Sequence, residues 1–347
     1  MTHLSPLSIG LTSLVSGVVM MSALACGTAK PTEGSPDAQA TSQADAQAPS
    51  VTPLSFTTVA EFDPTKGQTP ESLHRLSSGE FITSMSLAAE LATVAQDGTT
   101  KSYGSLGKQV KDVHFNGIAI DDQGIVYAGL TNGGPAPSDP TGVYKFPKGG
   151  GTGTLFAGGM PVPNGLAFSG TDLYVSDSYL GVIFKVTRDG KATQWSADAK
   201  LKGDATACGG SGLPFPIGAN DIVVDGANLY MMVSDLGALV KIPIQGDGTA
   251  GQLAVVKQDC ALRSGDGLVR DPKDGSFIIA LILQDKLARV SSDGTISVIA
   301  SGEPLDSPAG LLLESNTLYV ANSALAEMFG VNTTRAPHTG LLKTTIH

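Results

Sequence analysis

The chain has 347 residues, of which 41% are hydrophobic and 16% are charged, so it can bury a sizeable core. Its 43 glycines suit many short strands joined by tight turns better than long helices. The formal net charge of −10 argues against nucleic acid as a partner, because phosphate binding requires a positive surface.

Residues 1–26 have the pattern of a bacterial lipoprotein signal peptide. Leu7–Ala25 is uncharged and largely apolar, and it stands directly before Cys26, which by this resemblance becomes the lipid-modified N-terminus. The segment lacks Lys and Arg before the apolar stretch, so plain secretion by cleavage after Ala25 and an uncleaved anchor stay open as alternatives. We expect an exported protein, lipid-anchored to a bacterial membrane and located in the periplasm or at the cell surface.

Residues 27–52 form a polar linker. Gly27–Ser50 contains no Val, Ile, Leu, Met or aromatic residue, so it cannot bury enough surface to order itself. We therefore expect a disordered tether over 27–52 and one folded domain over 53–347.

A repeat of about 48 residues fills this domain. Each unit begins with an Asn-Gly-like pair, followed by an apolar strand, a short turn and a second apolar strand. The leading residues of the six units are 45, 48, 56, 46 and 43 residues apart: Glu71, Asn116, Asn164, Asn220, Asp266 and Ala309. Four strands at this period are typical of a propeller blade, and six such blades need roughly 290 residues. The sequence therefore predicts an all-β, six-bladed β-propeller with four-stranded blades and few helices.

Turn signals in the second half of each unit support this prediction. Asp189-Gly190 and Asp293-Gly294 are expected to form two-residue hairpin turns with positive φ. The segment Phe56–Phe62 resembles an outermost blade strand, and we expect it to close the circle against the last unit, a place for which residues 341–346 also compete.

The leading residues also predict a site. The innermost strand of each blade lines the central channel, so equivalent positions lie on a circle around the axis. Five of the six side chains carry oxygen, and we call Glu71, Asn116, Asn164, Asn220 and Asp266 the oxygen ring. Carboxylate and amide oxygens suit a hard cation such as Ca²⁺ or another divalent ion, and Ala309 is expected to leave one side open for water and substrate. The alternative is that Asn-Gly and Asp-Gly merely form turns, although this does not account for Glu71.

The chain resembles the group of senescence marker protein, gluconolactonase and strictosidine-synthase-like propellers. The resemblance covers about residues 56–347 and rests on PES at 70–72, FNGIAIDDQG at 115–124, PNGLAFSGTDLYVSDS at 163–178 and ANDIVVDGANLYM at 219–231. It implies a catalytic calcium or other divalent ion on Glu71, Asn116 and Asn164. In the lactonases of this group the fourth-blade residue is an Asp that serves as ligand and base, whereas this chain has Asn220 followed by Asp221.

Three residues are candidates for the catalytic chemistry. Asp266, in the fifth unit, is expected to activate water or attack the substrate directly, and Asp221 is the second candidate. On an alternating strand Asp221 points away from a ring-facing Asn220, which also fits a supporting role at a blade interface. His114 lies two residues before Asn116 and can shuttle a proton, or it is an exposed loop residue without a role.

The rim of the pocket is expected to come from the loops before the inner strands, including 158–163 and 208–218. The repeat places Cys208 and Cys260 in equivalent loops of neighbouring units, so we expect a disulfide, with two free thiols as the alternative. Such a bridge predicts a rigid rim with apolar lining, suited to a small ester or lactone.

These observations favour a monomeric, calcium-dependent hydrolase of the lactonase or esterase type that acts on a small molecule in the central channel. The alternative is a non-catalytic surface propeller that binds a protein or polysaccharide. Asn220, in place of the Asp of the lactonases, favours this second interpretation.

Overall fold

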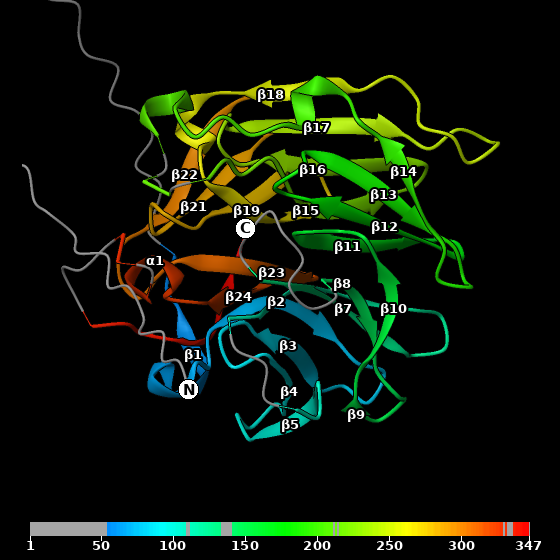
Figure 1. Cartoon of the computed structure of the whole chain (residues 1–347). Helices are drawn as coiled ribbons and strands as arrows, with labels where there is room; N and C mark the ends of the chain where they lie inside the picture. Colours follow the sequence, from blue (N-terminus) through cyan, green and yellow to red (C-terminus); the bar gives the residue numbers. More distant parts are fainter. Residues whose placement is uncertain are drawn as a thin grey trace, which may run out of the picture. The chain divides into compact units, whose positions relative to one another are not determined.

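The computed structural model describes residues 54–108, 112–132, 141–210, 212–213, 215–328, 330–331 and 336–346, all within one unit, Val51–His347. The predicted signal peptide, the lipidation site Cys26 and the tether lie outside the described residues. The described part of the chain is built almost wholly of β-strands, which form six sheets (Figure 1).

Six inner strands contact one another in a closed circle, β2 against β6, β6 against β11, and so on until β23 returns to β2. We number the blades 1 to 6 by these strands. They are β2 (Pro70–Arg75), β6 (His114–Ile120), β11 (Pro163–Ser169), β15 (Ala219–Asp225), β19 (Gly265–Arg270) and β23 (Pro308–Glu314). The prediction of a six-bladed β-propeller is confirmed.

Three further strands complete each blade by antiparallel pairing from the inside outward. The second strands are β3 (Phe81–Met85), β7 (Val126–Thr131), β12 (Asp172–Asp177), β16 (Asn228–Val233), β20 (Phe277–Leu281) and β24 (Thr317–Asn322). The third strands are β4 (Glu90–Val94), β8 (Gly142–Lys145), β13 (Val182–Val186), β17 (Ala238–Pro243), β21 (Lys286–Val290) and β25 (Gly340–Thr345). The outer strands are β5 (Thr100–Ser105), β10 (Thr154–Gly158), β14 (Ala192–Ser196), β18 (Ala254–Gln258), β22 (Ile296–Ser301) and β1 (Thr57–Glu61).

Blade 6 contains both the first and the last described strand. β1 pairs antiparallel with β25, so the start of the domain supplies the outer strand and the end supplies the third. The expected closure by Phe56–Phe62 is therefore confirmed, and residues 341–346 do not compete for that place. Blade 1 gains a short fifth strand, β9 (Gly151–Thr152), which pairs parallel with β5.

Helices are few and short, as the sequence predicts. The described residues contain one α-helix, α1 (Leu325–Met328), and the 3₁₀ helices η1 (Pro64–Lys66), η2 (Ala199–Leu201), η3 (Ala207–Gly209) and η4 (Cys260–Leu262). None of the helices in the described ranges is long and apolar enough to cross a membrane.

The Asp-Gly turns differ from the expected two-residue type. Gly190 donates a hydrogen bond to Thr187 O and has φ 84°, while Asp189 is not among the residues with positive φ. Thr187 N also bonds to Lys191 O, so the loop has three residues, a turn followed by a glycine in the left-handed region. Gly98, Gly248 and Gly294 make the same contacts. Glycine alone supplies the positive φ, and Asp is free to bond to the backbone two residues onward, as Asp293 does to Thr295 N.

The core is divided among the blade junctions. Six apolar clusters occur in the described residues, and each joins side chains of two neighbouring blades. In one of them Phe115 of β6 packs edge-to-face on Phe146 and lies in the same cluster as Ile82 and Leu91 of blade 1. Burial therefore holds neighbouring blades together, and no single blade has a complete core of its own.

A β-bulge interrupts every inner strand at its leading pair. The register shifts between Pro70 and Leu73 in β2, and at the equivalent place in the other five inner strands. The second residue of the pair is glycine in four blades, and none of these glycines has positive φ. A Cβ on Gly117 would lie 1.9 Å from Asn164 O, and one on Gly267 would lie 2.2 Å from Ala309 O. These glycines allow neighbouring inner strands to approach closely. The Asn-Gly pairs are therefore parts of bulged strands and do not form turns.

The substitution Gly117→Ala is expected to destabilise the domain by about 3 kcal/mol, because the new methyl group meets the backbone of the next inner strand. Gly246→Ala is the control, since a Cβ at that position meets nothing within 4 Å. Urea unfolding of both variants measures the effect. Equal stability of the two would contradict the packing described for the inner strands.

Candidate functional site

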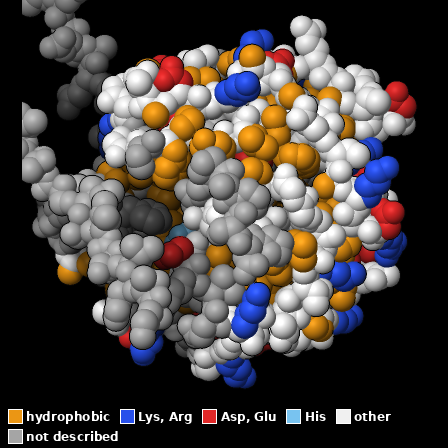
Figure 2. Space-filling view, viewed as in Figure 1, with side chains coloured by type: hydrophobic (Ala, Val, Ile, Leu, Met, Phe, Trp, Pro, Cys, Tyr) orange, Lys and Arg blue, Asp and Glu red, His pale blue; other side chains and the backbone are white. Residues whose placement is uncertain are grey.

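A cavity of about 530 Å³ opens at one end of the central channel, and all five residues of the oxygen ring line it. Hydrophobic side chains gather beside the hollow on this face of the molecule (Figure 2). The cavity lies where six inner strands begin, so residues 195 positions apart in sequence, Glu71 and Asp266, share one wall. The structure thus brings together the set of side chains that the repeat singled out.

The bulges set the direction of the ring side chains. At a bulge two residues face one on the partner strand, which breaks the regular alternation of side chains and re-aims one of them. In β15 the bulge covers Asn220 and Asp221: Asn220 lines the cavity, and Asp221 is not among the residues that line it. The same break occurs at Asn116 and Asn164.

The amides of two ring residues are oriented by the protein. Asn116 Nδ2 donates to Pro163 O at 3.2 Å, and Asn220 Nδ2 donates to Ser234 Oγ at 2.9 Å. Both amide nitrogens are thereby turned to protein acceptors, and each amide oxygen is left as an acceptor. Asn220 is 4% exposed, and its Oδ1 has no hydrogen-bond partner within the described ranges. A buried oxygen without a donor is costly and suits a site that receives a cation.

Two carboxyls lie against these amides. Glu71 is 9% exposed and Asp266 is 5% exposed, and Glu71 accepts no hydrogen bond from any described residue. Burial, and then the charges of Asp266 and Asp221, raise the pKa of Glu71 well above its usual value. Burial and the charge of Asp221 also raise the pKa of Asp266 to about 7, although a hydrogen bond with Asn220 opposes this. The surroundings of both carboxyls therefore disfavour their ionised forms in the absence of a cation.

Asp221 braces a blade junction. Its carboxylate accepts hydrogen bonds from Ile222 N at 2.9 Å and from Leu268 N, in the next inner strand, at 3.3 Å. Ser72 occupies the same position in blade 1, and its Oγ accepts from Ile118 N at 3.1 Å. Asp221 thus stands where four other blades have glycine, and it reaches the neighbouring strand. Asp221, the second catalytic candidate, does not line the cavity, and its charge adds to burial in raising the pKa values of Glu71 and Asp266.

His114 is the first residue of β6 and lines the cavity beside Asn116. It is half-buried, and burial lowers the pKa of its imidazole, although the charge of Asp112 opposes this shift. The imidazole of His114 is therefore favoured in its neutral form, in which one nitrogen can accept a proton.

Ala309 does not leave the expected opening. It is fully buried and does not line the cavity. The wall of blade 6 is instead made by Leu325 and Ala326 of α1, which begins two residues after Ser323. Ala326 N donates to Ser307 Oγ at 3.0 Å, which fixes the helix over the sixth inner strand. No sequence pattern indicates this wall, because a helix of four residues has no measurable periodicity.

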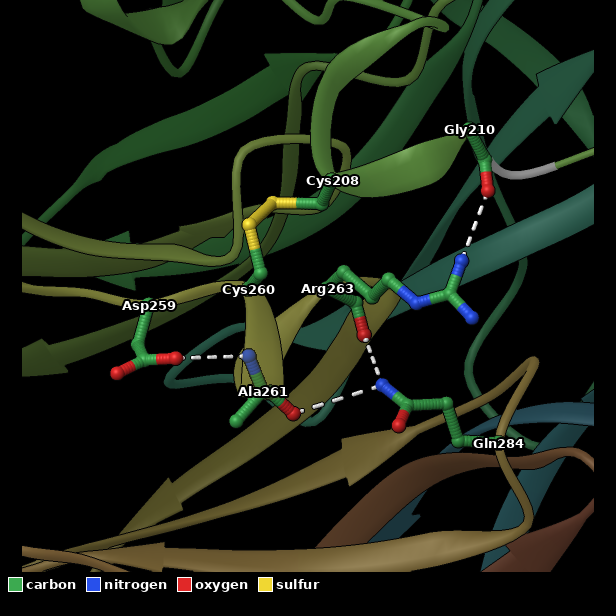
Figure 3. Close-up of a disulfide and its surroundings, with 7 residues drawn as sticks. All are labelled: Cys208, Gly210, Asp259, Cys260, Ala261, Arg263 and Gln284. Atoms are coloured by element: carbon green, nitrogen blue, oxygen red, sulfur yellow. Dashed lines mark hydrogen bonds between the residues drawn. A yellow bond between two sulfur atoms is a disulfide. The ribbon is translucent and has the colours of Figure 1, made fainter. Parts of the chain in front are cut away.

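A disulfide fixes the rim, as predicted. Cys208 in η3 and Cys260 in η4 are bonded, with their Cα atoms 5.2 Å apart (Figure 3). Arg263 Nη1 donates to Gly210 O at 2.8 Å, and Gln284 Nε2 donates to Arg263 O at 2.7 Å. These contacts tie the segment before β15 to blade 5, and that segment supplies Leu213, Phe215, Pro216 and Ile217 to the cavity. The apolar rim expected from the sequence is present.

Several supporting residues were missed by the sequence analysis. Ser84 Oγ donates to Asn116 O and Ser176 Oγ donates to Asn220 O, each at 2.6 Å and each from the preceding blade. Ser234 Oγ bonds to Gly265 O at 2.6 Å in the same way. The carboxylate of Asp235 accepts from Ile217 N at 2.7 Å and holds the rim. The Ser-Asp pairs at 176–177 and 234–235 recur at the end of the second strand, which is the signal that could have revealed them.

The donor set fits a hard cation. Ca²⁺ prefers carboxylate and amide oxygens, and the ring offers two carboxyls and three amides without sulfur or imidazole. The described residues contain no group of three or more His, Cys, Asp and Glu that could hold a metal, so any such site depends on the three Asn oxygens. Asn220 Oδ1 and the Glu71 carboxyl are buried and receive no hydrogen bond from the described residues. A bound cation would offset the free-energy cost of burying them.

The sequence model of one protein family, described as the SMP-30/Gluconolactonase/LRE-like region, matches residues 47–209. No curated protein matches the chain. Among solved structures, a calcium-binding protein, regucalcin, from Agrobacterium tumefaciens strain C58 is 17% identical, with 84% of this chain and 94% of that chain covered and a TM-score of 0.58. A candidate gluconolactonase is 14% identical, with coverages of 84% and 92% and a TM-score of 0.58. A streptogramin B lyase is 16% identical, with coverages of 78% and 80% and a TM-score of 0.53. At these identities the likeness to each structure shows the shared fold.

The raised pKa of Asp266 has a consequence for stability without metal. An acid whose pKa rises from about 4 in the unfolded chain to about 7 in the folded protein binds more protons when folded. The metal-free protein should therefore lose stability as pH rises from 4 to 7. In EDTA at pH 8, Asp266→Asn is expected to raise the melting temperature by on the order of 5 °C.

The exposed turn residue Asp122 provides the control, because Asp122→Asn removes a carboxylate outside the cavity. Thermal scans between pH 5 and pH 8 compare the three proteins. A variant Asp266→Asn that melts below the parent at pH 8 would show that the buried carboxyl is not under repulsion.

Proposed function

We propose that this propeller of the SMP-30/gluconolactonase superfamily is a calcium-dependent hydrolase of the lactonase or esterase type that acts on a small molecule in the central cavity. The observation that carries the proposal is the oxygen ring in a largely apolar cavity, where Asn220 Oδ1 and the Glu71 carboxyl receive no hydrogen bond from the described part of the chain. Such a set is costly to bury for structure alone, since neutral apolar residues would fill the channel without this penalty.

Glu71, Asn116, Asn164, Asn220 and Asp266 are the residues that would hold the ion. A bound calcium ion would supply Lewis-acid polarisation of a carbonyl oxygen. The backbones of Asn116 and Asn220 are fixed by the serines of the preceding blades, so these oxygens need little rearrangement on binding. The name of regucalcin as a calcium-binding protein supports this assignment, since that chain shares the fold.

Asp266 is the proposed base or nucleophile. It projects into the cavity from β19, and its pKa of about 7 in the absence of metal means that it can hold or release a proton near neutral pH. His114, on the adjoining wall, is kept toward its neutral form and can accept a proton during product release. The apolar rim excludes water around these groups and thereby strengthens their interactions with a substrate.

The Cys208–Cys260 disulfide supports the proposal that the protein is exported, because disulfides persist in oxidising compartments. Lipid attachment at Cys26 would then keep the propeller at a bacterial membrane, as a monomer.

Calcium should stabilise the fold. Saturation at 100 times the dissociation constant contributes about 2.7 kcal/mol, so the melting temperature should rise by on the order of 5 °C when EDTA is replaced by calcium. The variant Glu71→Gln should lose most of this rise. Asp122→Asn should keep it, since that side chain is exposed and outside the cavity. An equal rise in all three proteins would place the ion elsewhere.

Calcium binding should release protons. Because the pKa values of Glu71 and Asp266 are raised, protons compete with the ion, and affinity should increase about tenfold from pH 6 to pH 7. Calorimetry in two buffers with different ionisation enthalpies counts the protons released. An affinity that does not change across this range would argue against carboxylate ligation.

Hydrolysis of a panel of lactones and aryl esters, with calcium and with EDTA, tests the reaction itself. We expect calcium-dependent turnover that falls at least about 1,000-fold in Asp266→Asn, with calcium-induced stabilisation measured in the same sample. A protein that is inert and insensitive to chelator would instead support the non-catalytic surface propeller.

A further inference from the structure

Apolar side chains form a large part of the cavity wall beside the oxygen ring. Apolar side chains from four different blades or their preceding loops face the cavity: Val162, Leu213, Phe215, Ile217, Ile282 and Leu325. They come from segments far apart in sequence, so their common character belongs to the site and is not a property of one apolar stretch. A pocket of about 530 Å³ with such a wall is in the size range that encloses a small organic molecule.

Among the described lining residues, the carboxyls are the charged groups, and a histidine lies beside them. The described lining contains Glu71, Asp235 and Asp266 and includes neither Lys nor Arg. The carboxylate of Asp235 is already bonded to Ile217 N at 2.7 Å. An anionic substituent away from the reacting carbonyl would therefore meet no cationic side chain in the described lining, and it would be desolvated against apolar atoms.

Three hydroxyls of the described lining are also engaged. Thr131 Oγ1 donates to Pro161 O at 3.1 Å, Ser178 Oγ to Ala219 O at 2.8 Å, and Ser234 Oγ to Gly265 O at 2.6 Å. Their protons brace the backbone of neighbouring blades. Ser264 Oγ, which also lines the cavity, is buried and has no partner within the described ranges, so one hydroxyl stays available to a ligand. A ligand that carries many hydroxyl groups would still leave most of them unpaired against the apolar side chains of this wall.

The segment that carries Phe215 and Ile217 is preorganised. It is held by the Cys208–Cys260 disulfide, by Arg263 Nη1 to Gly210 O, and by Asp235 to Ile217 N. An apolar wall that is already in place does not need to be ordered when a ligand binds. This favours ligands that contribute apolar area rather than directional hydrogen bonds.

We propose that the substrate is an uncharged lactone or ester with an apolar chain, and that the wall around Phe215 and Ile217 selects it over anionic and polyhydroxylated analogues. The identification of the ligand as a lactone or ester rests on the proposed hydrolase function. The reacting carbonyl is directed to the oxygen ring and the chain lies along the wall.

The first experiment measures hydrolysis of γ-lactones whose alkyl side chain grows from none to six carbons, with glucono-δ-lactone and isocitric lactone as the polyhydroxylated and anionic comparators. We expect kcat/KM to rise about fourfold per methylene and both comparators to be at least about tenfold poorer than the unsubstituted γ-lactone. The variant Phe215→Ala should flatten the dependence on chain length. Leu155→Ala is its control, because Leu155 is 44% exposed on the outer strand β10 and lies outside the cavity.

The second experiment does not depend on catalysis. The uncharged fluorescent probe N-phenyl-1-naphthylamine is bound to the protein in EDTA and displaced by the same lactone series. Displacement that strengthens with chain length, and weakens in Phe215→Ala but not in Leu155→Ala, supports the inference even if no lactone is hydrolysed, in which case only the proposed hydrolase function fails.

Hydrolysis without any dependence on chain length, or a preference for either comparator, would overturn the inference while leaving the hydrolase function standing. Failure of the probe to bind at all would also overturn it.

Discussion

The close approach of six inner strands around one axis is the constraint on which the rest of the molecule depends. Where Gly117 meets Asn164 O there is no room for a side chain, so one residue of each leading pair is confined to glycine or to a side chain that bonds across the junction. Ser72 and Asp221 take the second course, each accepting a hydrogen bond from the next strand. The bulge that relieves this crowding also re-aims the other residue of the pair. Packing and the oxygen ring therefore have one origin.

This arrangement concentrates unfavourable polar burial at one place. Burial, and then neighbouring carboxylates, raise the pKa values of Glu71 and Asp266, and Asn220 Oδ1 has no donor in the described part of the chain. The surrounding blades compensate with hydrogen bonds between serine hydroxyls and backbone carbonyls, and with an apolar cluster at each junction. A rigid frame thus maintains a site that would not be stable as an isolated cluster.

The sequence predicted the features that repeat. A leading residue at each of six units defined the blades, the ring and the closing strand, because a propeller converts equal spacing along the chain into equal position around an axis. It could not predict local features that leave no pattern in the sequence. Leu325 of α1 occupies the wall near Ala309 from a helix too short to leave a pattern, and the direction of Asp221 depends on a bulge that simple alternation does not anticipate. The sequence also located the Asp-Gly loops but predicted two residues in each where the structure has three. Gly190 has positive φ and Asp189 does not, so the two-residue turn does not form.

The pairing of β1 with β25 has a consequence for how the domain is made. Thr57 lies opposite Lys343, so among the described strands the outermost strand of blade 6 is synthesised first and its partner last. Five blades can be complete on the ribosome while β1 still lacks its partner, and the circle cannot close until β25 has been synthesised. Until then β1 presents an unpaired edge, which makes the nascent chain dependent on protection from aggregation. Closure of this one sheet is thus the step that converts a linear array of blades into a cooperative unit.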